Sequence, residues 1–155
     1  MEKINEQVQE DFIAKFNNLL NNKEVDIYFI DAMHPQHNVK TGRAWVKKRL
    51  EFKYISNTGR QRLNIHGALN IRTKEVITLF QPKVNQEWVL ELLTLLREKS
   101  KNKEIYIFSD NARYYHAKSV QEYTKNNNIT MNYLPVYSPN LNIIERLWKF
   151  LEMKF

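Results

Sequence analysis

Apolar residues recur along this chain of 155 residues at two spacings, one typical of helices and one typical of strands. Helical spacing predicts four helices, over residues 2–22, 85–99, 116–127 and 141–155. Alternating or continuous apolar runs predict six strands, over about 25–31, 49–55, 62–71, 75–81, 104–109 and 129–135. An antiparallel meander followed by alternating helix and strand predicts an α/β protein with a mixed sheet flanked by helices.

Three carboxylates stand where these predicted elements begin or end. Asp31 closes the first strand, Asp110 follows the strand 104–109, and Glu145 lies in the first turn of the last helix, with 34 residues between it and Asp110. If the two strands are adjacent and parallel, both aspartates leave the sheet at one carboxyl edge. A few hard oxygen ligands suit a site with two Mg²⁺ (or Mn²⁺) ions for phosphoryl transfer. Asp31, Asp110 and Glu145 are therefore the predicted catalytic and metal-binding residues.

Each carboxylate also has an ordinary structural explanation. Glu145 follows Asn142 by three residues, the spacing of a capping box at a helix start. Asp110 could form a turn or a helix cap after a buried strand, and Asp31 could begin a turn. The catalytic interpretation depends on all three acids acting together.

The polar neighbours of these acids are further candidates. Asn111 and His34 could orient the metal ligands without binding the metal themselves, and His116 could contact phosphate. His116 could equally cap the following helix, and His34 with Pro35 could form a turn. His66 lies inside a predicted strand, where a core or edge role is expected. None of the histidines has the paired spacing of a zinc site.

Positive charge is concentrated in one segment. The chain has a net charge of +7, and residues 40–62 contain eight basic residues and one acid. Clustered lysine and arginine suit a phosphate backbone. The segment could equally be a solvated loop, and its tryptophan could pack on the sheet instead of stacking on a base. The residues predicted to bind DNA here are Arg43, Trp45, Lys47, Lys48, Arg49, Arg60 and Arg62.

Length and composition limit the class of protein. With 43% apolar residues, the chain can bury one sizeable core, which indicates a single domain. It contains no apolar run of about 18 residues and no signal peptide, so we expect no membrane partner and an intracellular location. With no cysteine there is no disulfide, thiolate zinc site or cysteine nucleophile.

The chain resembles the catalytic domain of DDE transposases, in the mariner-like branch that includes many bacterial insertion-sequence transposases. The matching stretches include Phe29–Asp31, His66–Ala68, Asp110–His116, Leu134–Pro139 and Leu141–Trp148. The resemblance implies a ribonuclease H-like, retroviral integrase-like fold and metal-dependent cleavage and transfer of DNA strands during transposition. It also implies transposon ends and target DNA as partners, a homodimer on DNA, and a bacterial cytoplasm with nucleoid association during the reaction.

Some features depart from that family pattern. Ile143 stands where a proline is common. We expect residues 1–24 to be a linker helix and 25–155 the catalytic domain, without the N-terminal DNA-binding domain and with a shortened C-terminal end. The chain could be a split-frame product, an engineered piece or a decayed copy. Two alternatives remain: a metal-dependent nuclease of the same fold, and an inactive remnant that only binds DNA.

Overall fold

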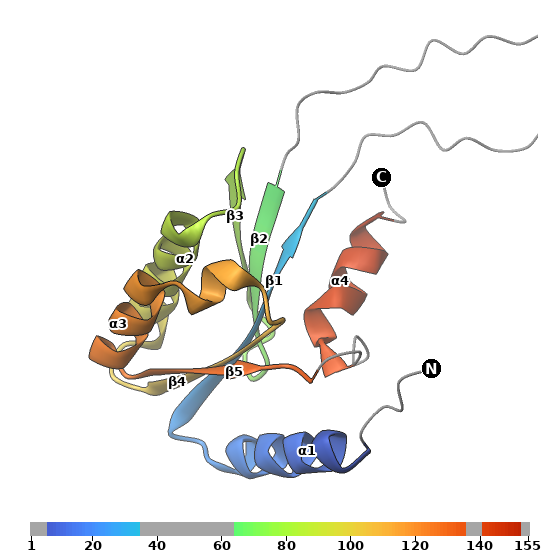
Figure 1. Cartoon of the computed structure of the whole chain (residues 1–155). Helices are drawn as coiled ribbons and strands as arrows, with labels where there is room; N and C mark the ends of the chain where they lie inside the picture. Colours follow the sequence, from blue (N-terminus) through green and yellow to red (C-terminus); the bar gives the residue numbers. More distant parts are fainter. Residues whose placement is uncertain (1–5, 35–63, 136–140, 153–155) are drawn as a thin grey trace, which may run out of the picture.

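The described part of the chain forms a five-stranded sheet with helices on both faces (Figure 1). The computed structural model describes residues 6–34, 64–135 and 141–152. The elements are α1 (Glu6–Asn21), β1 (Val25–Met33), β2 (Asn64–Asn70), β3 (Val76–Gln81), α2 (Gln86–Ser100), β4 (Glu104–Ser109), the 3₁₀ helix η1 (Arg113–His116), α3 (Lys118–Asn126), β5 (Ile129–Tyr133) and α4 (Ile143–Glu152). No helix in these ranges is long and apolar enough to cross a membrane.

The strand order is β3-β2-β1-β4-β5, with β1 at the centre of the sheet. The strands β1, β2 and β3 form an antiparallel meander, whereas β4 pairs in parallel with β1 and β5 pairs in parallel with β4. This arrangement confirms the predicted mixed sheet flanked by helices. The strand predicted over 49–55 lies outside the described residues.

Two predicted helix starts are two residues early. The helix expected over 141–155 begins at Ile143. The helix expected over 116–127 begins at Lys118, because Ala117 has the extended backbone angles φ −57° and ψ 141°. The residues just before Ala117 form η1 instead. The chain therefore turns between Asp110 and α3 through a short 3₁₀ segment.

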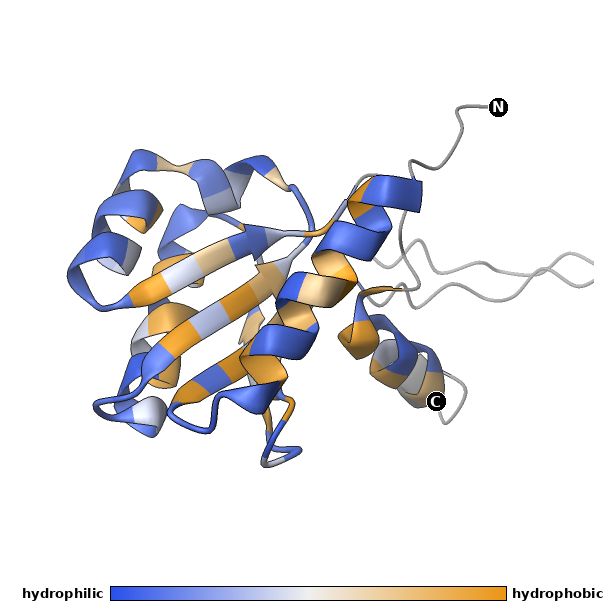
Figure 2. Ribbon diagram, turned by 90° about the horizontal axis from the view of Figure 1, so that it is seen from below, coloured by the Kyte–Doolittle hydropathy of each residue, from blue (hydrophilic) through white to orange (hydrophobic). Residues whose placement is uncertain are grey.

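The sheet separates two hydrophobic cores. On one face, α2 and α3 cover the strands with fully buried side chains such as Leu92, Leu96 and Val120. On the other face, α4 and α1 cover a cluster that includes Phe29 and Phe108. Figure 2 shows the strands largely in hydrophobic colours, with hydrophilic colours on much of the outer surface of the helices. The two faces are covered because both sets of side chains of β1 and β4 are apolar.

The N-terminal helix α1 packs on the sheet through aromatic side chains. The ring of Phe12 packs edge-on against that of Phe108, with ring centroids 5.3 Å apart. The ring of Phe16 packs edge-on against the same ring, with centroids 5.5 Å apart. At the end of α1, the guanidinium group of Arg72 donates hydrogen bonds to the carbonyl oxygens of Leu19 at 3.1 Å and Val25 at 3.0 Å. These contacts fix α1 to the sheet; the domain boundary at residue 24 remains a prediction.

Candidate active site

Asp31 and Asp110 stand near the carboxyl ends of two neighbouring strands. Strands β1 and β4 are parallel, and their register sets Phe29 opposite Phe108. Asp31 lies two residues after Phe29 within β1, and Asp110 lies two residues after Phe108, just past the end of β4, so the two acids stand at the same end of the paired strands. The predicted adjacency of the two strands is confirmed. Asp110 is exposed, and one of its carboxylate oxygens accepts a hydrogen bond from the Ala112 amide at 3.2 Å.

Glu145 comes from α4, which crosses that face of the sheet. Ile144 and Trp148 are buried at 0% and 5% exposure and pack against β1 and β2, which holds the helix in place. The Glu145 amide donates to the backbone carbonyl of Asn142 at 3.2 Å. The side-chain amide of Asn142 has no hydrogen-bond partner within the described residues. The capping-box explanation for Glu145 therefore lacks its side-chain hydrogen bond.

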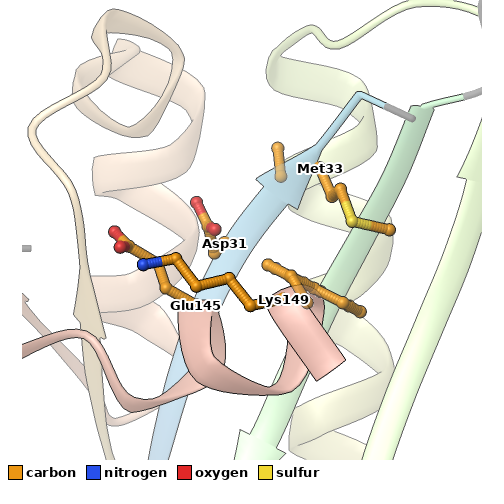
Figure 3. A pocket seen from close by; sticks show the side chains of 6 residues that line it. Asp31, Met33, Glu145 and Lys149 are labelled. Carbon is orange, nitrogen blue, oxygen red and sulfur yellow. The ribbon is translucent and has the colours of Figure 1, made fainter. Parts of the chain in front are cut away.

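A pocket of about 230 Å³ lies between β1 and α4. Asp31 and Glu145 line it together with Ala32, Met33, Trp148 and Lys149. Figure 3 shows the carboxylates of Asp31 and Glu145 on the same side of this pocket, with the Lys149 amine beside that of Glu145. Asp31 and Glu145, which are far apart in sequence, therefore face one space.

The carboxylates influence each other's ionisation. Burial raises the pKa of Asp31 from 3.8 to about 7, and the negative charges of Asp110 and Glu145 add to the rise. Burial also raises the pKa of Glu145; the Lys149 ammonium group opposes this effect, and Asp110 adds to it. Each of the three acids thus lies close enough to another for their charges to interact. Neighbouring negative charges of this kind favour the binding of a cation.

The donor types fit Mg²⁺, which prefers a small number of carboxylate oxygens and keeps several waters. Among residues 6–34, 64–135 and 141–152, no three acidic or histidine side chains lie close enough to hold an ion as they stand. Asp31 and Glu145 share the pocket, and Asp110 stands at its sheet edge without lining it. Because like charges repel, a cation between the three acids would favour their closer approach.

His116 lies beside Asp110 in the fold. Its Nε2 atom is 2.5 Å from the Asn111 side-chain oxygen, and its ring stacks on Tyr133 with centroids 4.2 Å apart. The ring does not cap α3, because Ala117 occupies the cap position. Asn111 therefore orients His116 at the exposed edge of the sheet, next to the predicted metal ligand.

His34 is directed toward the neighbouring strand. Its Nδ1 atom is 2.5 Å from the Asn64 side-chain oxygen, and the Asn64 amide donates to the carbonyl of Pro82 at 2.8 Å. These contacts hold the last residue before the segment 35–63 against the first residue after it. The predicted DNA-binding residues within that segment lie outside the described residues: Arg43, Trp45, Lys47, Lys48, Arg49, Arg60 and Arg62.

A buried polar pair supports the loop that carries Asp110. His66 is fully buried, as its place in a strand predicted, and its Nε2 atom is 2.9 Å from the Tyr115 hydroxyl. Burial lowers the pKa of His66 to about 4, so its ring is neutral near pH 7. Burial also raises the pKa of Tyr114 to about 12, and the Asp110 charge adds to this rise. Sequence reasoning missed both tyrosines, although the pair follows Asp110 closely.

The mixed five-stranded sheet of the described residues, with helices on both faces, is a ribonuclease H-like fold. A chain of the simian T-cell lymphotropic virus intasome, in complex with PP2A regulatory subunit B56 gamma, has a similar fold with a TM-score of 0.60. The two chains are 16% identical, over 82% of this chain and 38% of that one. The HTLV-2 integrase catalytic core domain in complex with magnesium (trimeric form) gives a TM-score of 0.49 at 13% identity, over 83% of this chain and 72% of that one.

Sequence similarity identifies the family. The model of the family described as DDE superfamily endonuclease matches residues 26–155, and the chain belongs to this family. A protein of Shigella sonnei, described as the insertion element IS630 uncharacterized 39 kDa protein, is 25% identical over 130 residues. That match covers 83% of this chain and 38% of the relative, so the chain spans less than half the length of its relative. The predicted resemblance to DDE transposases is confirmed.

Proposed function

We propose that this chain is the catalytic domain of an insertion-sequence transposase that cuts and joins DNA strands with two Mg²⁺ or Mn²⁺ ions. One observation carries the proposal: parallel pairing of β1 and β4 puts Asp31 and Asp110 at the same end of neighbouring strands, and α4 brings Glu145 into the pocket lined by Asp31. A family of endonucleases whose sequence pattern covers residues 26–155 supports it.

In this proposal the three acids would hold the metal ions. Bound divalent ions stabilise the attacking and leaving oxygens of a displacement at phosphorus. Asp31 would have to lose its proton before it binds an ion, because burial raises its pKa to about 7. Lys149 would supply one positive charge beside Glu145, at the mouth of the pocket, where a phosphate oxygen could accept a hydrogen bond from it.

DNA would approach along the edge of the sheet that carries the acids. The segment 35–63, which contains the basic residues predicted to bind DNA, follows the carboxyl end of β1 in the sequence. His116 and Tyr133 present a stacked pair of rings on the other side of Asp110. We propose that the basic residues bind phosphates, and that His116 contacts the strand near the cleavage point. A dimer on paired DNA ends, in a bacterial cell, belongs to the same proposal.

The test is a strand-cleavage and joining assay on duplex DNA carrying insertion-sequence ends, with Mn²⁺ as the metal. We expect metal-dependent nicking by the wild-type chain and its loss in Asp110→Asn and Glu145→Gln. Asp26→Asn is a matched control, because Asp26 lies on the same strand as Asp31 but pairs with Lys103 at 3.6 Å. Joined products from a free 3′-hydroxyl would distinguish a transposase from a simple nuclease.

Two results would contradict the proposal. Nicking that survives Asp110→Asn would place the chemistry elsewhere. DNA binding that is weakened by salt but indifferent to metal and to both substitutions, without any cleavage, would indicate a remnant that only binds DNA.

A further inference from the structure

Gly67 lies where a side chain has no room. It stands in β2 directly opposite Asp31 of β1. A Cβ atom at this position would lie 2.4 Å from both Cζ2 and Cη2 of Trp148, and 3.3 Å from Cδ1 of Ile144. Carbon atoms in contact are normally about 3.5–4.0 Å apart, so an added methyl group would displace the indole ring by roughly 1 Å.

Backbone conformation does not explain this glycine. Gly67 does not have a positive φ and forms a regular strand pair with Asp31 and Thr78. A glycine in such a position marks the close approach of another group. Here that group is the six-membered ring of Trp148, which enters the space that a side chain would take.

Shape, more than hydrogen bonding, holds Trp148 against this strand. Its side chain is 5% exposed, and its indole Nε1 atom forms no hydrogen bond of normal geometry within the described residues. The indole N–H lies near enough to Asp31 to act against the rise in the pKa of that carboxyl group, as the smallest of several influences. The depth to which the ring inserts therefore depends mainly on the space above Gly67. Ile144, one turn earlier on α4, contacts the same space.

The position of α4 sets the position of Glu145. Trp148 lies three residues after Glu145, and both residues line the pocket with Asp31. A helix moves as a rigid body over one turn, so a displaced Trp148 shifts the Glu145 carboxylate relative to Asp31. A misplacement of about 1 Å in a catalytic group can cost roughly 100-fold in rate.

We propose that Gly67 is a positioning residue, whose missing side chain seats Trp148 on the sheet and so sets the separation of Glu145 from Asp31. The packing part stands on the contacts alone. The consequence for metal binding rests on the proposed function.

The first test measures hydrogen exchange of the α4 amides by mass spectrometry in Gly67→Ala. We expect exchange in α4 to rise about tenfold or more, with α2 unchanged. Trp148→Phe removes the two ring atoms nearest to the added methyl group and leaves only the 3.3 Å contact with Ile144, so Gly67→Ala should have a much smaller effect in the double variant. Ile107→Val is the control, because it perturbs the core on the opposite face of the sheet. Unchanged α4 exchange in Gly67→Ala would overturn the inference, as would equal effects with and without Trp148.

The second test measures the Mn²⁺ affinity of the same variants by calorimetry. We expect Gly67→Ala to weaken binding by about 10- to 100-fold, the usual effect of a residue that positions a metal ligand. The Ile107→Val control should retain wild-type affinity. Wild-type affinity in Gly67→Ala would contradict the link to Glu145. If the wild-type chain bound no Mn²⁺, the proposed function would fail, and the exchange measurement would still decide the role of Gly67.

Discussion

Replacing Asp31 by asparagine is predicted to stabilise the metal-free protein at alkaline pH. The pKa of Asp31 rises from 3.8 to about 7 in the folded chain, chiefly through burial. Between these two pH values the folded chain binds the Asp31 proton and the unfolded chain has released it. The free energy of unfolding therefore falls as the pH rises through this window.

The magnitude follows from the same pKa. A tenfold change in proton affinity corresponds to about 1.4 kcal/mol, so a rise from 3.8 to about 7 costs about 4 kcal/mol once the folded carboxyl group has ionised. Asparagine has the same shape without the charge. We expect Asp31→Asn to be more stable than wild type by about 2–4 kcal/mol at pH 8, which corresponds to roughly 5–15 °C in Tm. The difference should disappear near pH 4.

Urea unfolding at pH 4, 6 and 8 in the presence of EDTA measures this difference. Asp26→Asn serves as a control, because its ion pair with Lys103 lies away from the three-acid site. An Asp31→Asn variant that is no more stable than wild type at pH 8, or equally stabilised at pH 4, would refute the reasoning. The same variant should lose metal-dependent activity, so the charge that destabilises the fold is the one that the proposed reaction requires.

Three further predictions concern metal binding and packing. Mn²⁺ at 100 times its Kd should raise the unfolding free energy of the wild-type chain by about 2.7 kcal/mol and leave Glu145→Gln unaffected, as thermal unfolding with and without the ion would show. Arg72→Ala should cost about 2 kcal/mol or more and speed hydrogen exchange in α1, because its guanidinium group holds several carbonyl oxygens at the end of that helix. Tyr115→Phe should cost about 1–3 kcal/mol in urea unfolding, because it leaves Nε2 of the buried His66 without a partner.

Much of the fold was predictable because its strands are strongly apolar. Strand β4 reads as a continuous apolar run in the sequence, as predicted. The end of β1 was predicted at Asp31, but the strand continues to Met33, because Asp31, Ala32 and Met33 still pair with β2. The start of α3 was not predictable from the spacing of apolar residues. Alanine has a high helix propensity, yet Ala117 has an extended backbone in the structure. Local propensity is a weak guide where a turn after a strand is set by tertiary packing.

The candidate site was predictable in its acids but not in their surroundings. Asp31, Asp110 and Glu145 follow from strand ends and a helix start, which periodicity reveals. The roles of Gly67 and Lys149 depend on how closely α4 packs across the sheet. The spacing of residues in the sequence does not give the distance between α4 and the sheet. A role of His34 in supporting the metal ligands stays a prediction; its contact with Asn64 could not be predicted from the sequence. A side chain that is close to a metal-binding acid in the sequence, such as His34, can therefore contact a neighbouring strand.

Calorimetric titration of Mn²⁺ into the wild-type chain, Asp110→Asn and Glu145→Gln tests the central claim most directly. Asp110 follows β4 and Glu145 lies on α4, so only convergence at one site makes both necessary for the same binding event. We expect saturable binding to the wild-type chain that is lost in both variants. Binding that persists in either variant, or that is absent from the wild-type chain, would contradict a metal site built from these acids.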